Sequence, residues 1–282
     1  MSPDRTDAAP FGTVHPIPGD WGAHRIPDLS GRLAVVTGGN TGLGLATARE
    51  LARAGADLVL AVRSTERGAV AAADIARTAP RSRVAVRRLD LADLSSVREF
   101  ADRLLDEHPA LDLLVNNAGI MAVPRRTTAD GFESQFGINH LGHYALTGRL
   151  LPALGAATAA RVVTVSSDLH AIGRLDFRDL QSKRHYGRLR AYGNSKLANL
   201  LFTAELDRRA AAAGMDLRAY AVHPGLVATS LATAGRPLLV RLLLAVPQAL
   251  VAVRPATGAL PALCAATLPG LPGGLYLGPR GR

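Results

Sequence analysis

Short runs of apolar, often β-branched residues alternate along the chain with longer stretches whose apolar residues recur at helical spacing. Each short run has the length of a buried strand, and each longer stretch has the length of an amphipathic helix. The pattern predicts strands over residues 32–37, 57–62, 83–89, 111–116, 161–166 and 217–222, and helices over 44–55, 66–79, 94–108, 132–154 and 192–214.

Strands and helices in regular alternation indicate right-handed crossovers and a parallel sheet with helices on both faces. The predicted fold class is therefore α/β, a doubly wound parallel sheet. A chain of 282 residues can form one such domain with a sizeable core. We expect a partly ordered N-terminal arm over residues 1–30 and a single domain over 31–282. Ligands of such sheets bind beyond the carboxyl ends of the strands, so functional residues are expected there.

The first strand runs directly into TGGNTGLG, residues 37–44. Glycines in such a turn let the backbone turn tightly, approach a pyrophosphate and pack the helix on the sheet, while the helix N-terminus attracts the anion. Glycines alone are a weak signal, but their place between a strand and a helix favours a dinucleotide site over a structural turn. The expected cofactor contacts are Gly38, Asn40, Thr41, Gly42, Leu43 and Gly44.

The second strand ends in AVRS. At this position, proteins that bind NAD carry an acidic residue, which binds the ribose hydroxyls. Arg63 stands there instead and suits the 2′-phosphate of NADP. NADP is therefore the favoured cofactor, and NAD stays open because Arg63 is also compatible with an ordinary surface arginine.

Two more strand ends carry candidate cofactor contacts. Asp90, after the third strand, can accept a hydrogen bond from an adenine amino group, and the alternative role of helix N-cap suits Asp93 better. NNAG follows the fourth strand, where its amides and glycine allow close approach to a cofactor, although alone it would indicate only a turn. The further contacts expected here are Leu91, Asn117, Ala118 and Gly119.

TGGNTGLG, LDL, NNAG, INH, VSS, YGNSK and HPG follow one another in this order, and from about residue 30 the chain resembles the short-chain dehydrogenases/reductases. FESQFGINHLGHYALT, RVVTVSSDLHAIG and YAVHPGLVATSL are similar to the retinol dehydrogenase-like branch. The resemblance implies a Rossmann-type catalytic domain and an NADP(H)-dependent oxidoreductase that interconverts a ketone or aldehyde and an alcohol. The glycine turn lacks the basic residue that some NADP-preferring members carry there.

The resemblance also implies roles for the reacting groups. Tyr192 matches the catalytic acid/base, Lys196 its lysine partner, and Ser167 the serine that binds the substrate oxygen. Asn139 matches the asparagine that completes the tetrad through a water. The segment that closes over the nicotinamide end of the cofactor matches Pro224, Gly225 and Thr229.

The chemistry of these residue types supports the roles. A carbonyl that accepts a hydride develops negative charge on oxygen and needs a proton donor and a hydrogen-bond donor, which Tyr192 and Ser167 supply. A free tyrosine titrates near ~10, and a cation on the same helix face favours the phenolate, so Lys196 is expected to lower the pKa of Tyr192. Alone, a tyrosine and a lysine at this spacing would more often be surface residues. A compact ammonium can also bridge ribose hydroxyls and a phenol, which a planar guanidinium would do poorly.

The substrate end is predicted from two segments. Residues 168–191 form an insertion between Ser167 and Tyr192 that should border the substrate mouth, and residues 230–254 should form a lid region. The apolar stretch 237–253 is interrupted by polar residues and is shorter than the ~20 residues of a membrane span. A small lipophilic substrate is expected. Candidate contacts are His170, His185 and Tyr186, although the sequence favours a solvated loop for each.

Composition narrows the classes of function. A net charge of +10 could indicate nucleic acid, but the arginines are scattered and aromatic residues are only 4%, which argues against it. The single cysteine, Cys264, excludes an internal disulfide and a cysteine-cluster metal site, and no metal is expected. No apolar core segment marks the N-terminus as a secretion signal, so a cytoplasmic protein is expected. Peripheral membrane contact is not expected, although residues 237–253 leave it open. The sequence also leaves open whether the protein forms a homo-oligomer.

Two other functions stay open. One is the reduction of a conjugated carbon-carbon double bond, as in an enone, by an enzyme of the same family. The other is a non-catalytic regulator that senses NADP through the same fold. The complete set of tyrosine, lysine, serine and asparagine argues against the regulator.

Overall fold

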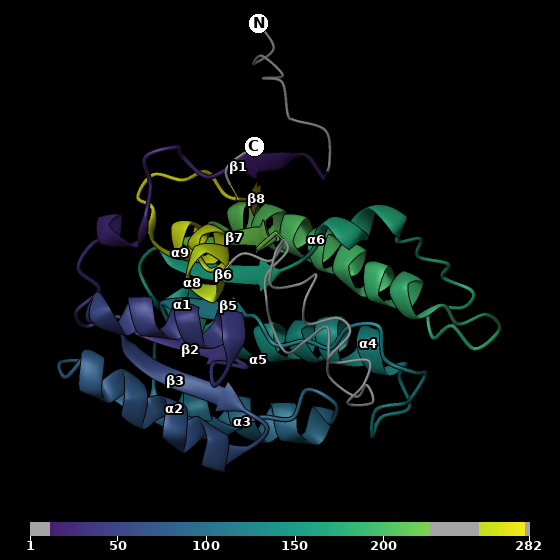
Figure 1. The fold of residues 1–282 in the computed structure, drawn as a ribbon, viewed down its shortest axis with the longest axis horizontal. Coiled ribbons are helices and arrows are strands. Elements are labelled where there is room, and N and C mark those ends of the chain that lie inside the picture. The colour runs from purple at the N-terminus through teal and green to yellow at the C-terminus, as the bar shows by residue number, and fades with distance from the viewer. Residues whose placement is uncertain (1–11, 226–253, 280–282) are drawn as a thin grey trace, which may run out of the picture.

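The computed structural model describes residues 12–225 and 254–279 and contains a central sheet in which every strand pair is parallel (Figure 1). The strand order is β1-β8-β7-β6-β5-β2-β3-β4. The strands are β1 Val14–Pro16, β2 Leu33–Thr37, β3 Asp57–Val62, β4 Val84–Arg88, β5 Leu113–Asn116, β6 Ala160–Val165, β7 Leu217–Val222 and β8 Tyr276–Gly278. The predicted doubly wound α/β class is confirmed.

The six predicted strands are all present, with ends shifted by two residues at most. Strands β1 and β8 were not predicted, because three residues are too few to give a periodic pattern. They pair with each other, Val14 opposite Tyr276, and the amide of Ile17 donates to the carbonyl of Gly278 at 3.2 Å. Segments from both ends of the chain therefore form one edge of the sheet.

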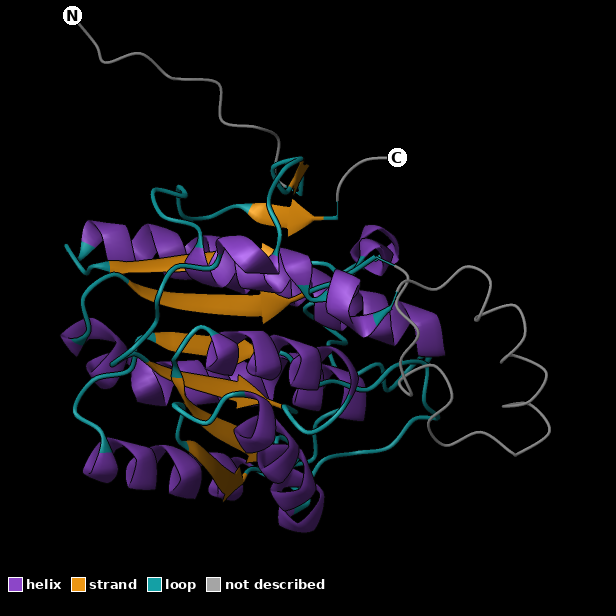
Figure 2. Ribbon diagram, turned by 60° about the vertical axis from the view of Figure 1, so that its left-hand side comes forward, coloured by secondary structure: helices purple, strands orange, loops and turns teal. Residues whose placement is uncertain are grey.

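Helices cover both faces of the sheet (Figure 2). One face carries α1 Gly42–Arg53, α2 Thr65–Thr78, α8 Pro255–Gly258 and α9 Leu260–Thr267, and the other carries α3 Leu94–Glu107, α5 Gly142–Ala156 and α6 Arg188–Ala212. Shorter elements are α4 Ser134–Phe136, a π-helical turn Gly137–Leu141, and 3₁₀ turns at Ala23–Arg25 and Asp168–Ile172. In residues 12–225 and 254–279, no helix has both the length and the apolar character needed to cross a bilayer.

The core has two layers, one on each face of the sheet, because side chains of a strand alternate between faces. In β2, Ala34 and Val36 belong to the layer under α1 and α9, while Val35 belongs to the layer under α3 and α5. All three are fully buried, which is why this strand has an uninterrupted apolar sequence. Cys264 of α9 is also buried in the first layer.

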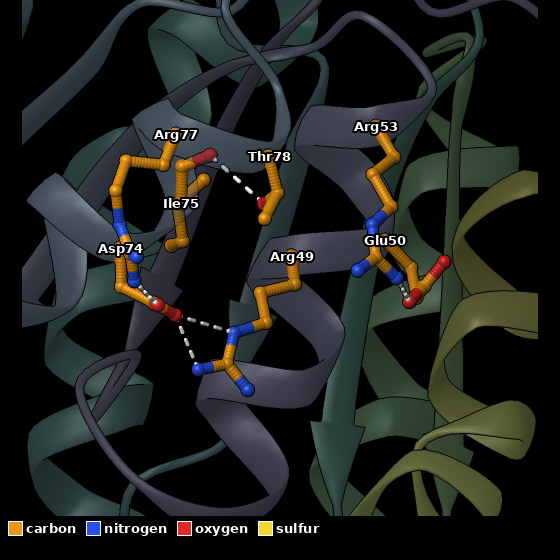
Figure 3. A network of polar contacts seen from close by, with 7 residues as sticks. All are labelled: Arg49, Glu50, Arg53, Asp74, Ile75, Arg77 and Thr78. Carbon is orange, nitrogen blue, oxygen red and sulfur yellow. Dashed lines mark hydrogen bonds and ion pairs between the residues drawn. The ribbon is translucent and has the colours of Figure 1, made fainter.

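Helices α1 and α2 are joined at the surface by charged side chains (Figure 3). Arg49 of α1 donates from its Nε to Asp74 of α2 at 3.0 Å, and Arg77 reaches the same carboxylate. These contacts hold the pKa of Asp74 below its usual range. They orient the two helices that follow β2 and β3, the strands expected to carry the cofactor contacts.

The segment before β2 is more closely packed than a partly ordered arm. Ile17 and Trp21 are buried in the core layer that contains α1 and α9, and Trp21 is only 2% exposed. The domain boundary expected at residue 30 remains a prediction, but residues 12–30 contribute directly to the core.

Replacing Trp21 with alanine should therefore lower the free energy of unfolding by about 3 to 5 kcal/mol, because a large buried side chain would leave a cavity. Urea unfolding followed by circular dichroism measures this. Val70→Ala on α2, where the side chain is 73% exposed, is the control and should change little. A Trp21→Ala protein as stable as the parent would show that the segment is not part of the cooperative fold.

Candidate active site

The order of the sheet places the two glycine-containing candidate segments together. Strand β2 lies between β3 and β5, so the connections that follow β2 and β5 leave the same edge in different directions and open a crevice. Thr37, the last residue of β2, joins them: its hydroxyl accepts from the amides of Asn117 and Ala118 at 2.9 and 3.0 Å. The turn 37–44 and the segment 116–119 thus form one site.

The turn after β2 has the geometry of an anion cradle. Gly38 and Gly42 have φ of +64° and +54°, in the left-handed region that favours glycine. A Cβ on Gly44 would lie 2.4 Å from the Asn117 side-chain nitrogen, so a larger residue does not fit there. Thr41 is the N-cap of α1 but makes no side-chain capping bond, which leaves the first amides of the helix available to an anion. The remaining predicted residues of the turn, Asn40 and Leu43, lie within it.

The ends of β3 and β4 carry the other predicted cofactor residues. Arg63 is exposed just after β3, and its guanidinium has no hydrogen bond or ion pair with residues 12–225 or 254–279. Asp93, and not Asp90, caps α3 by accepting from the amide of Ser95 at 2.8 Å, as the sequence favoured. Asp90 accepts from the amide of Ala92 at 3.0 Å through one oxygen. Leu91 is buried against the start of α5.

Helix α6 presents a polar face to the carboxyl edge of the sheet. Tyr192, Ser195, Lys196 and Asn199 follow one another at helical spacing, and all four are buried. Lys196 Nζ donates to the carbonyl of Val165, the last residue of β6, at 2.8 Å, and lies 5.5 Å from the centre of the Tyr192 ring. The predicted tyrosine and lysine are therefore brought together against the end of a central strand.

The two serines after β6 have different partners. Ser166 is buried and donates to the carbonyl of Lys196 at 2.9 Å, so its hydroxyl is used in packing α6 on the sheet. Ser167 is partly exposed and its hydroxyl hydrogen-bonds to Tyr192. Of this pair, the structure places the predicted serine, Ser167, beside the tyrosine.

Asn139 lies in the π-helical turn that interrupts the single helix predicted over residues 132–154. Its side chain is fully buried: Oδ1 accepts from the amide of Ile120 at 2.8 Å, and Nδ2 donates to the carbonyl of Ile120 at 2.9 Å and to Ser195 Oγ at 3.0 Å. The Ser195 hydroxyl donates in turn to the carbonyl of Tyr192 at 2.7 Å. Asn139 therefore links the segment after β5 to helix α6.

Residues 32–237 of the chain match the family model described as short chain dehydrogenase. The chain belongs to the short-chain dehydrogenase family.

Retinol dehydrogenases are among the relatives of this short-chain dehydrogenase. Mouse retinol dehydrogenase 12 is 51% identical over 199 residues, which are 71% of this chain and 62% of the relative. Human retinol dehydrogenase 13 is 47% identical over 204 residues, which are 72% of this chain and 61% of the relative. These identities place the chain in the retinol dehydrogenase-like branch of the family. The chain matches less than two thirds of the length of these relatives.

Solved structures share the fold. A crystal structure of an uncharacterized protein from Mycobacterium paratuberculosis superposes with a TM-score of 0.75 at 49% identity, covering 92% of this chain and 85% of that one. A Pseudomonas aeruginosa protein, RhlG in complex with NADP, superposes with a TM-score of 0.69 at 26% identity, covering 90% and 96%.

The expected effect of Lys196 on Tyr192 is wrong for this short-chain dehydrogenase without its cofactor. Burial raises the pKa of Tyr192 to about 12, and the hydrogen bond from Ser167 opposes this only in part. Burial also lowers the pKa of Lys196 to about 8. The ammonium binds the carbonyl of Val165, and desolvation outweighs its attraction for a phenolate.

The substrate end is only partly described. Pro224 and Gly225 follow β7, with Gly225 at φ +69°, while Thr229 and residues 237–253 lie outside the described residues. His170 donates from Nδ1 to the carbonyl of Ser167 at 2.8 Å. Tyr186 donates to the carbonyl of Val123 at 2.9 Å, which fixes its hydroxyl within the insertion, and His185 is exposed. Across the described parts of the chain, no three His, Cys, Asp or Glu side chains gather to hold a metal.

Sequence reasoning missed three polar residues of the site. Ser195 and Asn199 share a helix face with Tyr192 and Lys196, so helical spacing alone could have found them. His143 follows Asn139 by four residues, but its role depends on contacts across the sheet that no local pattern indicates.

Replacing Lys196 with methionine should stabilise the cofactor-free protein by about 1 to 3 kcal/mol at pH 7, because it removes a buried charge. Below pH about 8, Lys196 is protonated in both the folded and the unfolded parent, so the folded form bears the full cost of burying the charge. Between about 8 and 10.5 the folded form has released the proton and the unfolded form has not, so the parent gains stability as pH rises. The gap between variant and parent should therefore close over that range.

Urea unfolding at a series of pH values measures this gap. Lys183→Met is the matched control, since Lys183 is exposed and is the other lysine of the chain. It should give a small gap that does not change with pH. A gap for Lys196→Met that stays constant from pH 7 to 10.5 would contradict a buried ammonium of lowered pKa.

Proposed function

We propose that this short-chain dehydrogenase is an NADP(H)-dependent oxidoreductase that interconverts a carbonyl and an alcohol on a small lipophilic substrate. The proposal rests on one arrangement: Tyr192, Ser167 and Lys196 lie together at the carboxyl edge of the sheet, beside a glycine turn built for an anion. The names of its retinol dehydrogenase relatives support the same class of reaction.

The residues present fit a dinucleotide. The open N-terminus of α1 and the turn at Gly38 and Gly42 would hold the pyrophosphate. Arg63, with its guanidinium free of partners among the described residues, would hold a 2′-phosphate. Asp90 keeps one carboxylate oxygen for an adenine amino group, and Lys196 keeps two of its three ammonium protons for ribose hydroxyls.

The protonation state of Tyr192 suits proton donation. A bound reduced nicotinamide supplies the hydride that the carbonyl carbon accepts. With a pKa of about 12, the Tyr192 phenol is protonated at neutral pH and transfers its proton to the carbonyl oxygen, which gives the alcohol. Ser167 donates a hydrogen bond to the same oxygen as its charge develops. The nearby Lys196 ammonium stabilises the phenolate that remains until a proton returns from solvent.

The segment between Ser167 and Tyr192 supports a lipophilic substrate. Three of its apolar side chains are exposed, and Phe177 is the most open at 82%. Exposed apolar residues favour contact with an apolar molecule. The three are Ile172, Phe177 and Leu189. Of the two alternatives, reduction of a carbon-carbon double bond needs a proton on carbon, whereas Tyr192 and Ser167 lie side by side and can both donate to an oxygen.

Replacing Tyr192 with phenylalanine should abolish NADPH-dependent reduction of lipophilic aldehydes, ketones and enones, because the variant has no proton to donate. NADPH affinity, measured by fluorescence titration, should stay within about threefold of the parent, since the aromatic ring remains. Full activity in this variant would refute the proposed acid. A parent protein that binds NADPH but turns over no compound of the panel would favour the regulator.

Replacing Arg63 with alanine should weaken NADPH binding by about tenfold or more, because a charge-assisted contact to the 2′-phosphate is lost. NADH binding should change less than about twofold, since NADH lacks that phosphate. Arg98→Ala, an exposed arginine on α3, is the control for the loss of one surface charge. Equal weakening of NADPH and NADH, or equal effects of the two variants, would remove Arg63 from cofactor selection.

A further inference from the structure

The segment that follows β5, residues 117–120, is held by hydrogen bonds at both of its ends. At the first end, Thr37 Oγ1 accepts from the amides of Asn117 and Ala118, and the Asn117 side chain donates to the carbonyl of Thr37 at 2.8 Å. At the second end, the side chain of Asn139 forms a paired contact with the amide and carbonyl of Ile120. Thr37 and Asn139 are therefore the two anchors of this segment.

Gly119 lies between the two anchors and beside the reacting groups. A Cβ placed on Gly119 would lie 3.1 Å from Asn139 Oδ1 and 3.9 Å from Lys196 Nζ. Asn117 and Ala118, by contrast, lie against Gly38 and Gly44 of the glycine turn. The segment therefore runs from the phosphate side of the proposed cofactor site to the side that contains Lys196.

His143, near the start of α5, bridges the two anchors. Its Nδ1 is 3.0 Å from the backbone carbonyl of Asn139, and its Nε2 is 2.9 Å from Thr37 Oγ1. A carbonyl can only accept, so Nδ1 carries the proton and Nε2 accepts from the Thr37 hydroxyl. Thr37, residues 117–120, Asn139 and His143 thus form a closed ring of hydrogen bonds.

The ring needs a neutral histidine. His143 is buried, and its pKa is lowered to about 3, mainly by burial. The hydrogen bond to the Asn139 carbonyl opposes this shift, and the charges of Lys196 and His140 add to it. Protonation would place a hydrogen on both ring nitrogens and end the acceptor role toward Thr37. It would also add a second charge near Lys196. Burial therefore maintains the donor and acceptor pattern across the neutral pH range.

We propose that His143 is a positioning residue that fixes the separation between Thr37 and Asn139, and so preforms residues 117–120 for the nicotinamide half of the cofactor. The inference rests on the proposed cofactor site and adds to it a residue that does not touch the cofactor. A preformed segment lowers the ordering cost of binding, so its effect is measurable as affinity without any turnover.

The test compares NADPH with 2′,5′-ADP, which has the adenosine and phosphate half of NADP but no nicotinamide. His143→Leu should weaken NADPH binding about tenfold, because the loss of a hydrogen bond that holds the segment in place changes the binding free energy by about that factor. It should change 2′,5′-ADP binding less than about twofold, because that ligand does not reach Gly119. His143→Gln carries a donor and an acceptor on one side chain and should restore NADPH affinity to within about threefold of the parent.

Thr147→Val is the matched control on the same helix. Thr147 is as buried as His143, and its hydroxyl accepts from the Asn116 side chain at 3.0 Å, so this variant removes a buried hydrogen bond without opening the ring. It should lower thermal stability and leave both affinities unchanged. If His143→Leu does not fold, His143→Asn takes its place, because asparagine stays polar but is too short to reach both partners.

Three results would overturn the proposal: unchanged NADPH affinity in the folded His143 variants, equal weakening of NADPH and 2′,5′-ADP, or an equal loss of NADPH affinity in Thr147→Val. The outcome does not depend on finding the substrate. A protein that binds NADPH with the predicted pattern but shows no turnover would count against the proposed reaction and would support the ring.

Discussion

The buried ammonium of Lys196 imposes the constraint around which this site is built. A cation removed from water needs acceptors in fixed positions, and the last carbonyl of β6, that of Val165, provides one. The reverse contact, from the Ser166 hydroxyl to the carbonyl of Lys196, locks α6 to the same strand end. Tyr192, one turn earlier on α6, is thereby fixed beside Ser167, which follows that strand. The position of the reacting groups thus follows from where one charge is buried.

The same constraint extends to the neighbouring helices. Asn199 Nδ2 donates to two carbonyls, that of Asn139 at 3.1 Å and that of Val165 at 3.3 Å, so its Oδ1 faces His140 Nδ1 at 3.1 Å. The Asn139 carbonyl, within the π-helical turn at residues 137–141, is contacted by the side chains of His143 and Asn199. An irregular turn and a set of buried polar groups therefore satisfy one another, and each would be costly alone.

The sequence was sufficient for the fold because each strand and helix carries its own period. Six strands and the main helices needed no information beyond local pattern, whereas the three-residue strands β1 and β8 are recognised only by their pairing, β1 with β8 and β8 with β7. The identities of Tyr192, Lys196, Ser167 and Asn139 came from the resemblance to the short-chain dehydrogenases/reductases, and the structure brings the four together. The direction in which the pKa of Tyr192 shifts could not be predicted in this way. That shift depends on desolvation by the whole fold and not on the nearest charge.

The rarity of lysine in this chain now has a structural explanation at one position. Lys196 is 3% exposed, and a Cβ on Gly119 would lie 3.9 Å from its Nζ, so the buried ammonium lies close to the backbone of Gly119. A guanidinium is wider, is fixed in a plane and keeps its proton at any accessible pH, so it would carry the full desolvation penalty. A compact ammonium suits this position, and with a pKa of about 8 it remains mostly charged at pH 7. Shape therefore favours lysine over arginine at position 196.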